Sequence, residues 1–391
     1  MAYIHTTAEL HQFCEHARTA GLLALDLEFI RERTYVPQLA LIQLAVDDAC
    51  AIVDPLEVQD LSPLLELITS PELVKVLHAA AQDMEILYWH SRKIPLRIFD
   101  TQLAAAMVGL GEQLAYSRLV ETLLGVTLTK EETYSDWLQR PLSPSQVAYA
   151  LDDVRYLPAL HAILTARLEE LGRTAWAAEE FRKLDNLEIY QRQPRTLFRR
   201  IRRGRSLSSQ GLAILRELAE WREHEAQQRD CPPGSVLHDE ALVDLARKAP
   251  RTVDDLKRLR SLPVRELERS APALLARVEQ GLAVAEAARP VAMRQPRLSQ
   301  KEELMVKLLD TCLKTLCQRQ KLSASCVGNR GDLEALVYRY RHGQLAATGS
   351  PLLEGWRGAL VGKELLAVLE GRLSVHLDPT TGVLVLAPRT L

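Results

Sequence analysis

The segment LLALDLEF (residues 22–29) places two carboxylates, Asp26 and Glu28, in an apolar, leucine-rich run that is typical of a buried β-strand. Residues i and i+2 of a strand share a face, with Cα atoms roughly 6.6–7 Å apart. Two like charges about 4 Å apart repel by about 4 kcal/mol at an effective dielectric near 20. The pair therefore indicates either a strand end that opens to water or a site for a divalent cation, which prefers carboxylate oxygens.

The first 175 residues carry both strand and helix patterns. Strands are expected at residues 22–29, 39–46, 49–54 and 73–79, and helices around 60–69, 82–91, 101–108, 116–124 and 144–171. The first two strands are close in sequence and suit an antiparallel pair. Strands followed by interleaved helices predict an α/β layer fold.

The composition changes near residue 176, and the stretch RQPRTLFRRIRRGR contains seven arginines and no acidic residue. We expect a basic linker at 176–206, a helical domain at 207–289, a second helical domain at 298–375 and a terminal tail or hairpin at 376–391. The segment QQRDCPPGSVLHDEAL (227–242) resembles QRQKLSASCVGNRGDLEAL (318–336), about 90 residues later. That spacing is typical of two copies of one small bundle.

The overall composition bounds the class of protein. A chain of 391 residues with 47% hydrophobic residues can form two or three domains with cores of their own. The net charge of −2 restricts any nucleic-acid surface to a local patch. Six scattered cysteines favour reduced thiols, and neither a signal peptide nor a membrane span is evident, so we expect a cytoplasmic protein. A Walker loop and a dinucleotide-binding glycine motif are both missing from the sequence.

Further candidates for a site lie outside the first strand. Asp83 follows a strand-like segment at the start of a helix, where the alternative is simple helix capping. Tyr149 and Asp153 are spaced i, i+4 on one helix face, where the alternative is a solvated surface. Four carboxylates and a phenol from three segments can hold two divalent ions and orient an attacking water. The combination indicates phosphodiester hydrolysis.

These motifs resemble the DEDD superfamily of 3′–5′ exonucleases, tyrosine subclass, and the ribonuclease D family in particular. The resemblance is carried by LDLEFIRERTYVPQLALIQL (25–44), HAAAQDMEIL (78–87), FDTQLAA (99–105) and YALDDVRYL (149–157). Leu27 departs from the usual threonine at a position that supplies no carboxylate. Residues 207–250 resemble an HRDC domain, and residues 300–370 look like a divergent second copy.

The resemblance implies a ribonuclease H-like domain at residues 1–175, with a mixed sheet flanked by helices, followed by two all-α HRDC-type bundles. It implies that Asp26, Glu28 and Asp153 bind the ion that activates water, and that Asp26 bridges to a second ion supported by Asp83. It implies that Tyr149 positions the nucleophile. The ions would be Mg²⁺ or Mn²⁺, and the reaction would release 5′-mononucleotides from RNA 3′ ends, including those of transfer RNA precursors.

Single-stranded nucleic acid is gripped by basic residues and stacking aromatics. The candidates that we expect to contact RNA are Phe29, Arg31, Tyr35, Arg195, Phe198, Arg199, Arg200, Arg202 and Arg203. The alternatives are core packing for the aromatics and a solvated linker for the arginines. We expect a monomer, and we expect that truncation after residue 205 leaves mononucleotide release intact while it weakens the affinity for transfer RNA.

Two other functions stay open at the level of sequence. The substrate could be DNA, as in helicase-associated exonucleases, because the sequence identifies no contact with a 2′-hydroxyl. The chain could instead be an inactive nucleic-acid-binding scaffold, although the complete set of carboxylates argues against that.

Overall fold

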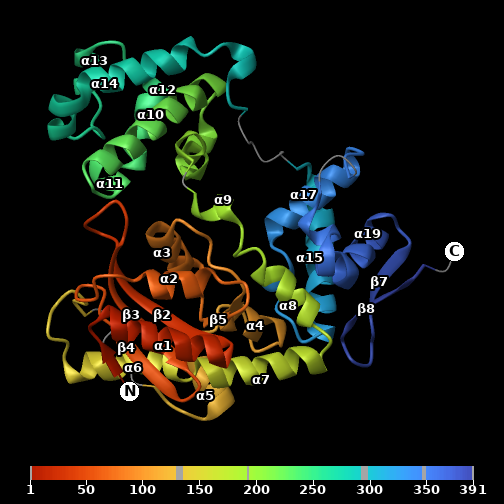
Figure 1. Cartoon of the computed structure of the whole chain (residues 1–391). Coiled ribbons are helices and arrows are strands. Elements are labelled where there is room, and N and C mark those ends of the chain that lie inside the picture. The colour runs from red at the N-terminus through yellow and green to blue at the C-terminus, as the bar shows by residue number, and fades with distance from the viewer. Residues whose placement is uncertain (1, 129–134, 192, 292–297, 346–348, 390–391) are drawn as a thin grey trace.

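The computed structural model of the chain describes residues 2–128, 135–191, 193–291, 298–345 and 349–389. It contains an N-terminal α/β domain (β1 to α8) and two helical domains, which we call the first (α10–α14) and the second (α15–α19) (Figure 1). The outer limits of the expected domains, at residues 1 and 391, and residue 192 of the expected linker lie outside the described residues. Within the described ranges, no helix has the length and apolar character needed to cross a membrane.

The α/β domain is built on one six-stranded mixed sheet with the order β1-β4-β3-β2-β5-β6. The strands are β1 (Ala2–Ile4), β2 (Leu22–Ile30), β3 (Gln38–Val46), β4 (Ala49–Val53), β5 (Val74–Leu77) and β6 (Ile98–Asp100). β2 and β3 are antiparallel, as the sequence predicted, and so are β3 and β4, whereas the other pairs are parallel. The sequence did not predict β1 and β6, because three residues are too few to show a period.

Alternation along β2 sends its side chains into two different cores. Leu23, Leu25 and Leu27 pack into the core that α1 (Thr7–Ala20), α2 (Ser62–Thr69) and α3 (Ala81–Ser91) cover. Ala24 faces the opposite core. Because Asp26 and Glu28 have the same parity as Ala24, they face that second side.

The second side of the sheet is covered by α4 (Thr101–Met107), α5 (Tyr116–Leu124), α6 (Pro144–Arg155) and α7 (Leu157–Glu170). The sequence predicted one helix over 144–171, and the structure corrects this to two. The physical reason is Pro158, which has no N–H to donate to the carbonyl of Val154. The N–H of Tyr156 donates to Val154 instead, and α6 ends there.

The segment expected to be a linker is folded, which corrects the prediction for residues 176–206. It contains α8 (Thr174–Phe181), α9 (Leu187–Tyr190) and two 3₁₀ helices, η1 (Pro194–Arg200) and η2 (Arg202–Ser206). Ala177 is buried in the α/β domain, whereas Phe198 is buried in the first helical domain. Buried apolar side chains thus anchor residues 176–206 to two different cores.

The two helical domains begin with the same series of elements. The first contains α10 (Ser209–Gln228), α11 (Pro233–Val236), α12 (Asp239–Lys248), α13 (Val253–Lys257) and α14 (Val264–Ala283). The second contains α15 (Gln300–Arg319), α16 (Ala324–Val327), α17 (Arg330–Arg341), α18 (Gly355–Arg357) and α19 (Lys363–Leu369). Helices α15, α16 and α17 begin at residues 300, 324 and 330, each 91 residues after α10, α11 and α12, which begin at 209, 233 and 239. The 91-residue interval agrees with the repeat seen in the sequence.

The chain ends in a hairpin of β7 (Leu373–Leu377) and β8 (Leu384–Pro388), paired antiparallel. Asp378 stabilises the turn by accepting hydrogen bonds from the N–H groups of Thr380 and Thr381. The sequence predicted this hairpin from the alternation in LSVHLDPTTGVLVLAP (373–388), and the pairing of Leu373 with Pro388 agrees with it. The domain limit expected at residue 376 falls inside the first strand.

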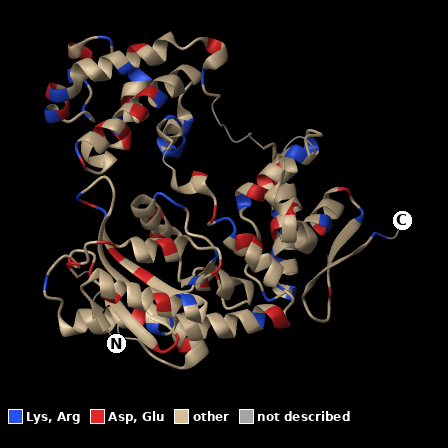
Figure 2. Cartoon of the chain, viewed as in Figure 1, with Lys and Arg blue, Asp and Glu red and all other residues tan. Residues whose placement is uncertain are grey.

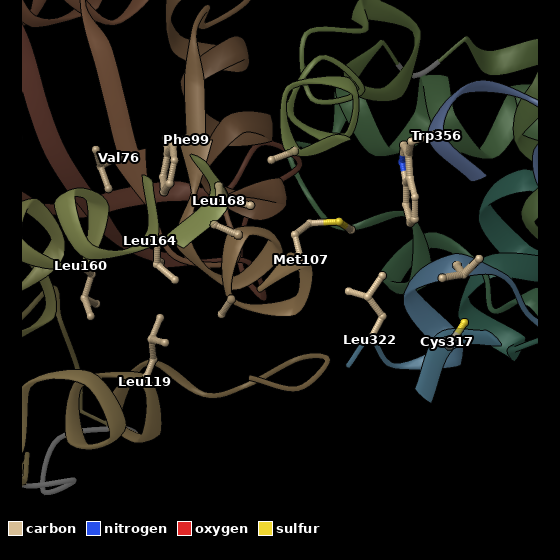
Figure 3. Close-up of a cluster of buried hydrophobic side chains, with 14 of the residues drawn as sticks. Val76, Phe99, Met107, Leu119, Leu160, Leu164, Leu168, Cys317, Leu322 and Trp356 are labelled. Atoms are coloured by element: carbon tan, nitrogen blue, oxygen red, sulfur yellow. The ribbon is translucent and has the colours of Figure 1, made fainter. Parts of the chain in front are cut away.

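The second helical domain shares a hydrophobic core with the α/β domain. One buried cluster contains Leu164 and Met107 of the α/β domain together with Leu322 and Trp356 of the second helical domain. Figure 3 shows Met107 between Leu164 and Leu322. The rings of Trp176 and Trp356 stack with centroids 5.2 Å apart. The buried guanidinium of Arg173 donates to the carbonyls of Met107 at 2.7 Å and Gln320 at 2.6 Å, one on each side. A chain that ends at residue 205 would expose this core. The structure therefore argues against the expectation that such a truncation leaves mononucleotide release intact.

Replacing Leu322 by Ala is expected to lower the free energy of unfolding by about 2–4 kcal/mol, because it opens a cavity in the shared core. Leu308→Ala on α15 is the control, since that side chain is 44% exposed and should change stability by no more than about 0.5 kcal/mol. Urea unfolding followed by the fluorescence of the tryptophans measures both. Equal stability of the two variants would show that the domains do not stabilise each other.

Candidate active site

Three carboxylates from β2 and α6 converge on the second face of the sheet. Asp26, Glu28 and Asp153 each offer an oxygen, and these oxygens lie within 4.8 Å of one another. β2 supplies two of them because its period is two, and α6 supplies the third because it packs across β2, β3 and β4. Figure 2 shows the acidic stretch within the sheet. The sequence predicted all three residues, and the structure brings their oxygens together.

Asp83 lies beside this triad in the first turn of α3 and is buried. Its pKa is raised well above the ordinary value, first by burial and then by the negative charges of Asp26 and Glu28. Arg31 acts in the opposite direction on the same pKa. Asp83 therefore belongs to the same electrostatic cluster, although it is outside the group of three whose oxygens are closest.

The turn that leads from β5 into α3 fixes the position of Asp83. Ala79 has a φ of 57°, in the left-handed region that residues with a Cβ rarely adopt. The buried carboxylate of Asp100 holds this turn, since it accepts hydrogen bonds from the N–H groups of Ala79 at 3.2 Å and Ala80 at 2.9 Å. The same carboxylate caps α4 through Gln102 and Leu103. Asp100 was visible in the sequence only as part of a family motif, without a role.

Tyr149 lies on α6 one turn before Asp153, as the i, i+4 spacing predicted. Its half-buried ring packs near the buried indole of Trp137, with centroids 6.0 Å apart. The neighbouring Asp152 is turned aside and forms an ion pair with Arg155 at 2.8 Å. The structure thus separates the two adjacent aspartates, and it is Asp153 that joins the triad.

Tyr116 is a second phenol at the site, and sequence reasoning missed it. Its hydroxyl donates to the backbone carbonyl of Asp152 at 2.9 Å, at the C-terminal end of α6 where carbonyls lack helical partners. Burial and the charges of Asp153 and Asp26 raise its pKa. Its ring lies 5.5 Å from that of His78, which contacts Thr101 and the carbonyl of Leu114. No local pattern marks Tyr116, because its contact spans 36 residues.

Tyr116→Phe is expected to lower kcat by roughly fivefold, because it removes a hydrogen bond worth about 1 kcal/mol that fixes the backbone beside Asp153. Tyr190→Phe is the matched control, since the buried Tyr190 also donates to a backbone carbonyl, that of Leu184 at 2.7 Å. Steady-state kinetics on an RNA oligonucleotide compare the two. Equal losses in both variants would assign Tyr116 to general stability.

The electrostatics of the triad fit a cation. Burial raises the pKa of Asp26 to about 7. Burial and the charge of Asp26 raise the pKa of Glu28 to about 8. Burial, Asp26, Glu28 and Asp152 raise the pKa of Asp153 to about 9. Carboxylates whose negative charge is so disfavoured are stabilised by a bound divalent ion, and all-oxygen donors are those that Mg²⁺ and Mn²⁺ accept.

The same shifts predict how the metal-free protein responds to pH. The folded pKa values of about 7, 8 and 9 exceed the unfolded values near 4, so the folded state binds more protons and loses stability as the pH rises from about 5 to 9. Mg²⁺ should raise Tm more at pH 9 than at pH 6. In the metal-free state at pH 9, Asp153→Asn should be more stable than the parent chain. Differential scanning fluorimetry with and without chelator tests this, and a lower Tm for the variant under those conditions would contradict it.

Comparison with known proteins places these residues in a family. A family model for 3′–5′ exonucleases matches residues 1–169, and the HRDC domain model matches residues 211–278. Ribonuclease D of Gluconacetobacter diazotrophicus is 36% identical over 96% of this chain and 95% of its own length. Ribonuclease D of Nitrobacter hamburgensis is 36% identical over 97% of both chains. The chain belongs to the ribonuclease D family of 3′–5′ exoribonucleases.

A solved ribonuclease D agrees with the fold. The crystal structure of Escherichia coli RNase D, described as an exoribonuclease involved in structured RNA processing, matches with a TM-score of 0.84 and 32% identity. The match covers 94% of this chain and 98% of that one. The predicted family, the mixed sheet flanked by helices and the HRDC domain are therefore confirmed, and so is the prediction of an enzyme of this class.

Three of the residues expected to contact RNA lie at the end of β2 and in the segment that follows it. Phe29 is half-buried, and Arg31 lies over its ring at 5.1 Å while it pairs with Glu85 at 2.9 Å. Tyr35 is buried at the junction with the first helical domain, where its hydroxyl donates to Glu223 at 2.5 Å and accepts from Gln227 at 2.9 Å. The structure corrects the expectation for Tyr35, because a ring enclosed in this junction does not offer a face to a base.

The arginine-rich segment contributes a basic surface to the first helical domain (Figure 2). Phe198 is buried in that domain's core, which corrects its expected role as a stacking residue. The arginines expected to contact RNA are exposed: Arg195, Arg199, Arg200, Arg202 and Arg203. Arg195 lies 3.3 Å from Glu217, and Arg203 lies 3.0 Å from Glu240. A pocket of 640 Å³ is lined by four arginines and a histidine, Arg200, Arg202, Arg203, Arg222 and His238, together with the acidic Asp239 and Glu240, which pair with Arg222 and Arg203.

Proposed function

We propose that this chain hydrolyses RNA from the 3′ end with two divalent ions and releases 5′-mononucleotides. The observation that carries the proposal is the meeting of Asp26, Glu28 and Asp153, with oxygens within 4.8 Å, beside the buried Asp83. Membership of the ribonuclease D family supports the same reaction.

The residues take distinct roles in the proposed reaction. Asp26, Glu28 and Asp153 would hold one ion, and Asp26 together with Asp83 would hold the second. When bound, Mg²⁺ or Mn²⁺ ions supply positive charge that stabilises the attacking and leaving oxygens of an in-line displacement. The hydroxyl of Tyr149 would orient the attacking water by a hydrogen bond. Asp100 and Tyr116 would keep the backbone beside Asp83 and Asp153 in place.

We propose structured RNA with a free 3′ end, such as a transfer RNA precursor, as the natural substrate. A DNA 3′–5′ exonuclease is the second candidate, because metal-assisted hydrolysis of a phosphodiester does not need the 2′-hydroxyl that distinguishes RNA from DNA. The exposed arginines around the 640 Å³ pocket support binding of the phosphate backbone, which is common to both polymers. Parallel digestion of matched RNA and DNA oligonucleotides distinguishes them.

We also propose that residues 298–375 form a second HRDC-like bundle, after an exonuclease domain at 1–175 and an HRDC domain at 207–289. The 91-residue interval between equivalent helices supports this. The first bundle would hold the body of the RNA, while the second stabilises the catalytic domain through the shared core. We further propose that the enzyme acts as a monomer in the cytoplasm, where its six free cysteines would stay reduced.

Asp26→Asn and Asp153→Asn are each expected to abolish hydrolysis, because either change removes a carboxylate from the triad, whereas Asp152→Asn should retain most of the activity. Product analysis on an end-labelled transfer RNA precursor measures this, with circular dichroism as the check on folding. Excess chelator should stop the reaction, and Mg²⁺ or Mn²⁺ but not Ca²⁺ should restore it. Full activity of Asp26→Asn or Asp153→Asn would overturn the proposed site.

A further inference from the structure

A single arginine ties the segment before α6 to the central sheet. The guanidinium of Arg140 donates through Nη1 to the carbonyl of Trp137 at 2.7 Å and through Nη2 to the carbonyl of Ala40 on β3 at 2.8 Å. Nη2 also donates to Asp54 Oδ1 at 2.9 Å, and Nε donates to Asp54 Oδ2. The fork geometry of arginine thus joins a loop, a strand and a carboxylate at one point.

The carboxylate in this cluster is built into the core. Asp54 follows β4 directly and is completely buried, so its charge depends on the partners that surround it. Besides Arg140, it accepts hydrogen bonds from the hydroxyl of Tyr3 at 3.0 Å and from the N–H of Leu56 at 3.0 Å. The anchor of Arg140 is therefore a buried, fully hydrogen-bonded carboxylate directly after β4, a strand of the same sheet that carries Asp26 and Glu28.

The residue that Arg140 holds is in contact with the proposed nucleophile-orienting phenol. Trp137 is 5% exposed, and its indole ring lies 6.0 Å from the ring of Tyr149 at an angle of 38°. Arg140 holds the carbonyl of Trp137, so the backbone that carries the indole is held against β3 and β4. Burial of the ring restricts the remaining side-chain rotation. Local hydrogen bonds support the same loop: Leu138 donates to Asp136, and Ser143 forms a capping box with Gln146 at the start of α6.

We propose that Arg140 is a positioning residue for the reaction, which acts through Trp137 to set the position of the Tyr149 ring relative to the carboxylates on the sheet. The inference rests on the proposed role of Tyr149. Arg140 itself contacts neither the triad nor Tyr149 in any described interaction. Lysine cannot replace it, because one ammonium group cannot donate along the separate directions of a guanidinium.

Arg140→Lys in the full chain is the central test, with kcat and KM measured on a single-stranded RNA oligonucleotide. We expect kcat to fall on the order of 10- to 100-fold, the cost of a small displacement at the reacting centre, while KM changes little. Arg229→Lys is the matched control. Arg229 forms a comparable two-pronged pair with the buried Glu266, at 2.8 and 2.9 Å, but lies in the first helical domain. Its kcat should stay within about twofold of the parent chain, in keeping with sites that are distant and independent.

A double-mutant cycle separates positioning from general stability. Tyr149→Phe removes the hydroxyl that Arg140 would position. The double variant Tyr149→Phe/Arg140→Lys should therefore have a kcat less than about threefold below that of Tyr149→Phe alone, because coupled residues are not additive. Trp137→Phe provides a second route, since it keeps an aromatic ring in the loop and should show the same non-additivity. Full additivity of Arg140→Lys with Tyr149→Phe would overturn the proposal, and so would equal losses of kcat in Arg140→Lys and Arg229→Lys.

Failure of the inference can be told apart from failure of the proposed function. If Tyr149→Phe alone leaves kcat unchanged, the assignment of the phenol is wrong, and the positioning role of Arg140 falls with it. If Tyr149→Phe lowers kcat and Arg140→Lys does not, only the inference is wrong. Thermal denaturation of every variant identifies a loss of kcat that comes from unfolding. If Arg140→Lys is unfolded, the non-additivity of Trp137→Phe with Tyr149→Phe tests the proposal, and full additivity of that pair would overturn it.

Discussion

Repulsion among clustered carboxylates, three half-buried and one buried, is the constraint on which the rest of this structure depends. Asp26, Glu28, Asp83 and Asp153 are brought together where burial alone already disfavours their charge. Folding tolerates the arrangement because each carboxylate is carried by an element that is fixed elsewhere: β2 by two cores, α3 by the Asp100 turn and α6 by Tyr116. The positive charge of a divalent ion would relieve the repulsion that remains, because it favours the ionised form of the carboxylates.

The two helical domains join the α/β domain in different ways. The second helical domain continues the hydrophobic core of the α/β domain, and Arg173 and the stacked tryptophans join the two. The first helical domain has its own core and meets the α/β domain through Tyr35. Tyr35 follows β2 by five residues. The domain that contains the 640 Å³ pocket therefore contacts the α/β domain near the end of the strand that carries Asp26 and Glu28.

Several residues that hold the site in place were given no role by the sequence reasoning. Asp100, Tyr116 and Arg140 each fix a backbone segment beside a predicted site residue, and each does so across at least 20 positions of the sequence. Periodicity reports only neighbours within a turn or two, so such contacts leave no local signal. Tyr35 and Phe198 were predicted to contact RNA but are buried in a core. The sequence could not distinguish the two roles, because an aromatic residue among basic ones is typical both of a stacking surface and of a core anchor.

The sequence by itself determined which side chains share a face: Asp26 with Glu28 through the period of a strand, and Tyr149 with Asp153 through the period of a helix. It also determined the family, because those pairs occur in a fixed order with the HRDC pattern behind them. Only the tertiary structure decided that the helix face of Asp153 meets the strand carboxylates, and that the arginine-rich segment is folded. The reason is physical: periods follow from local backbone geometry, whereas the meeting of distant faces is decided by packing across the sheet.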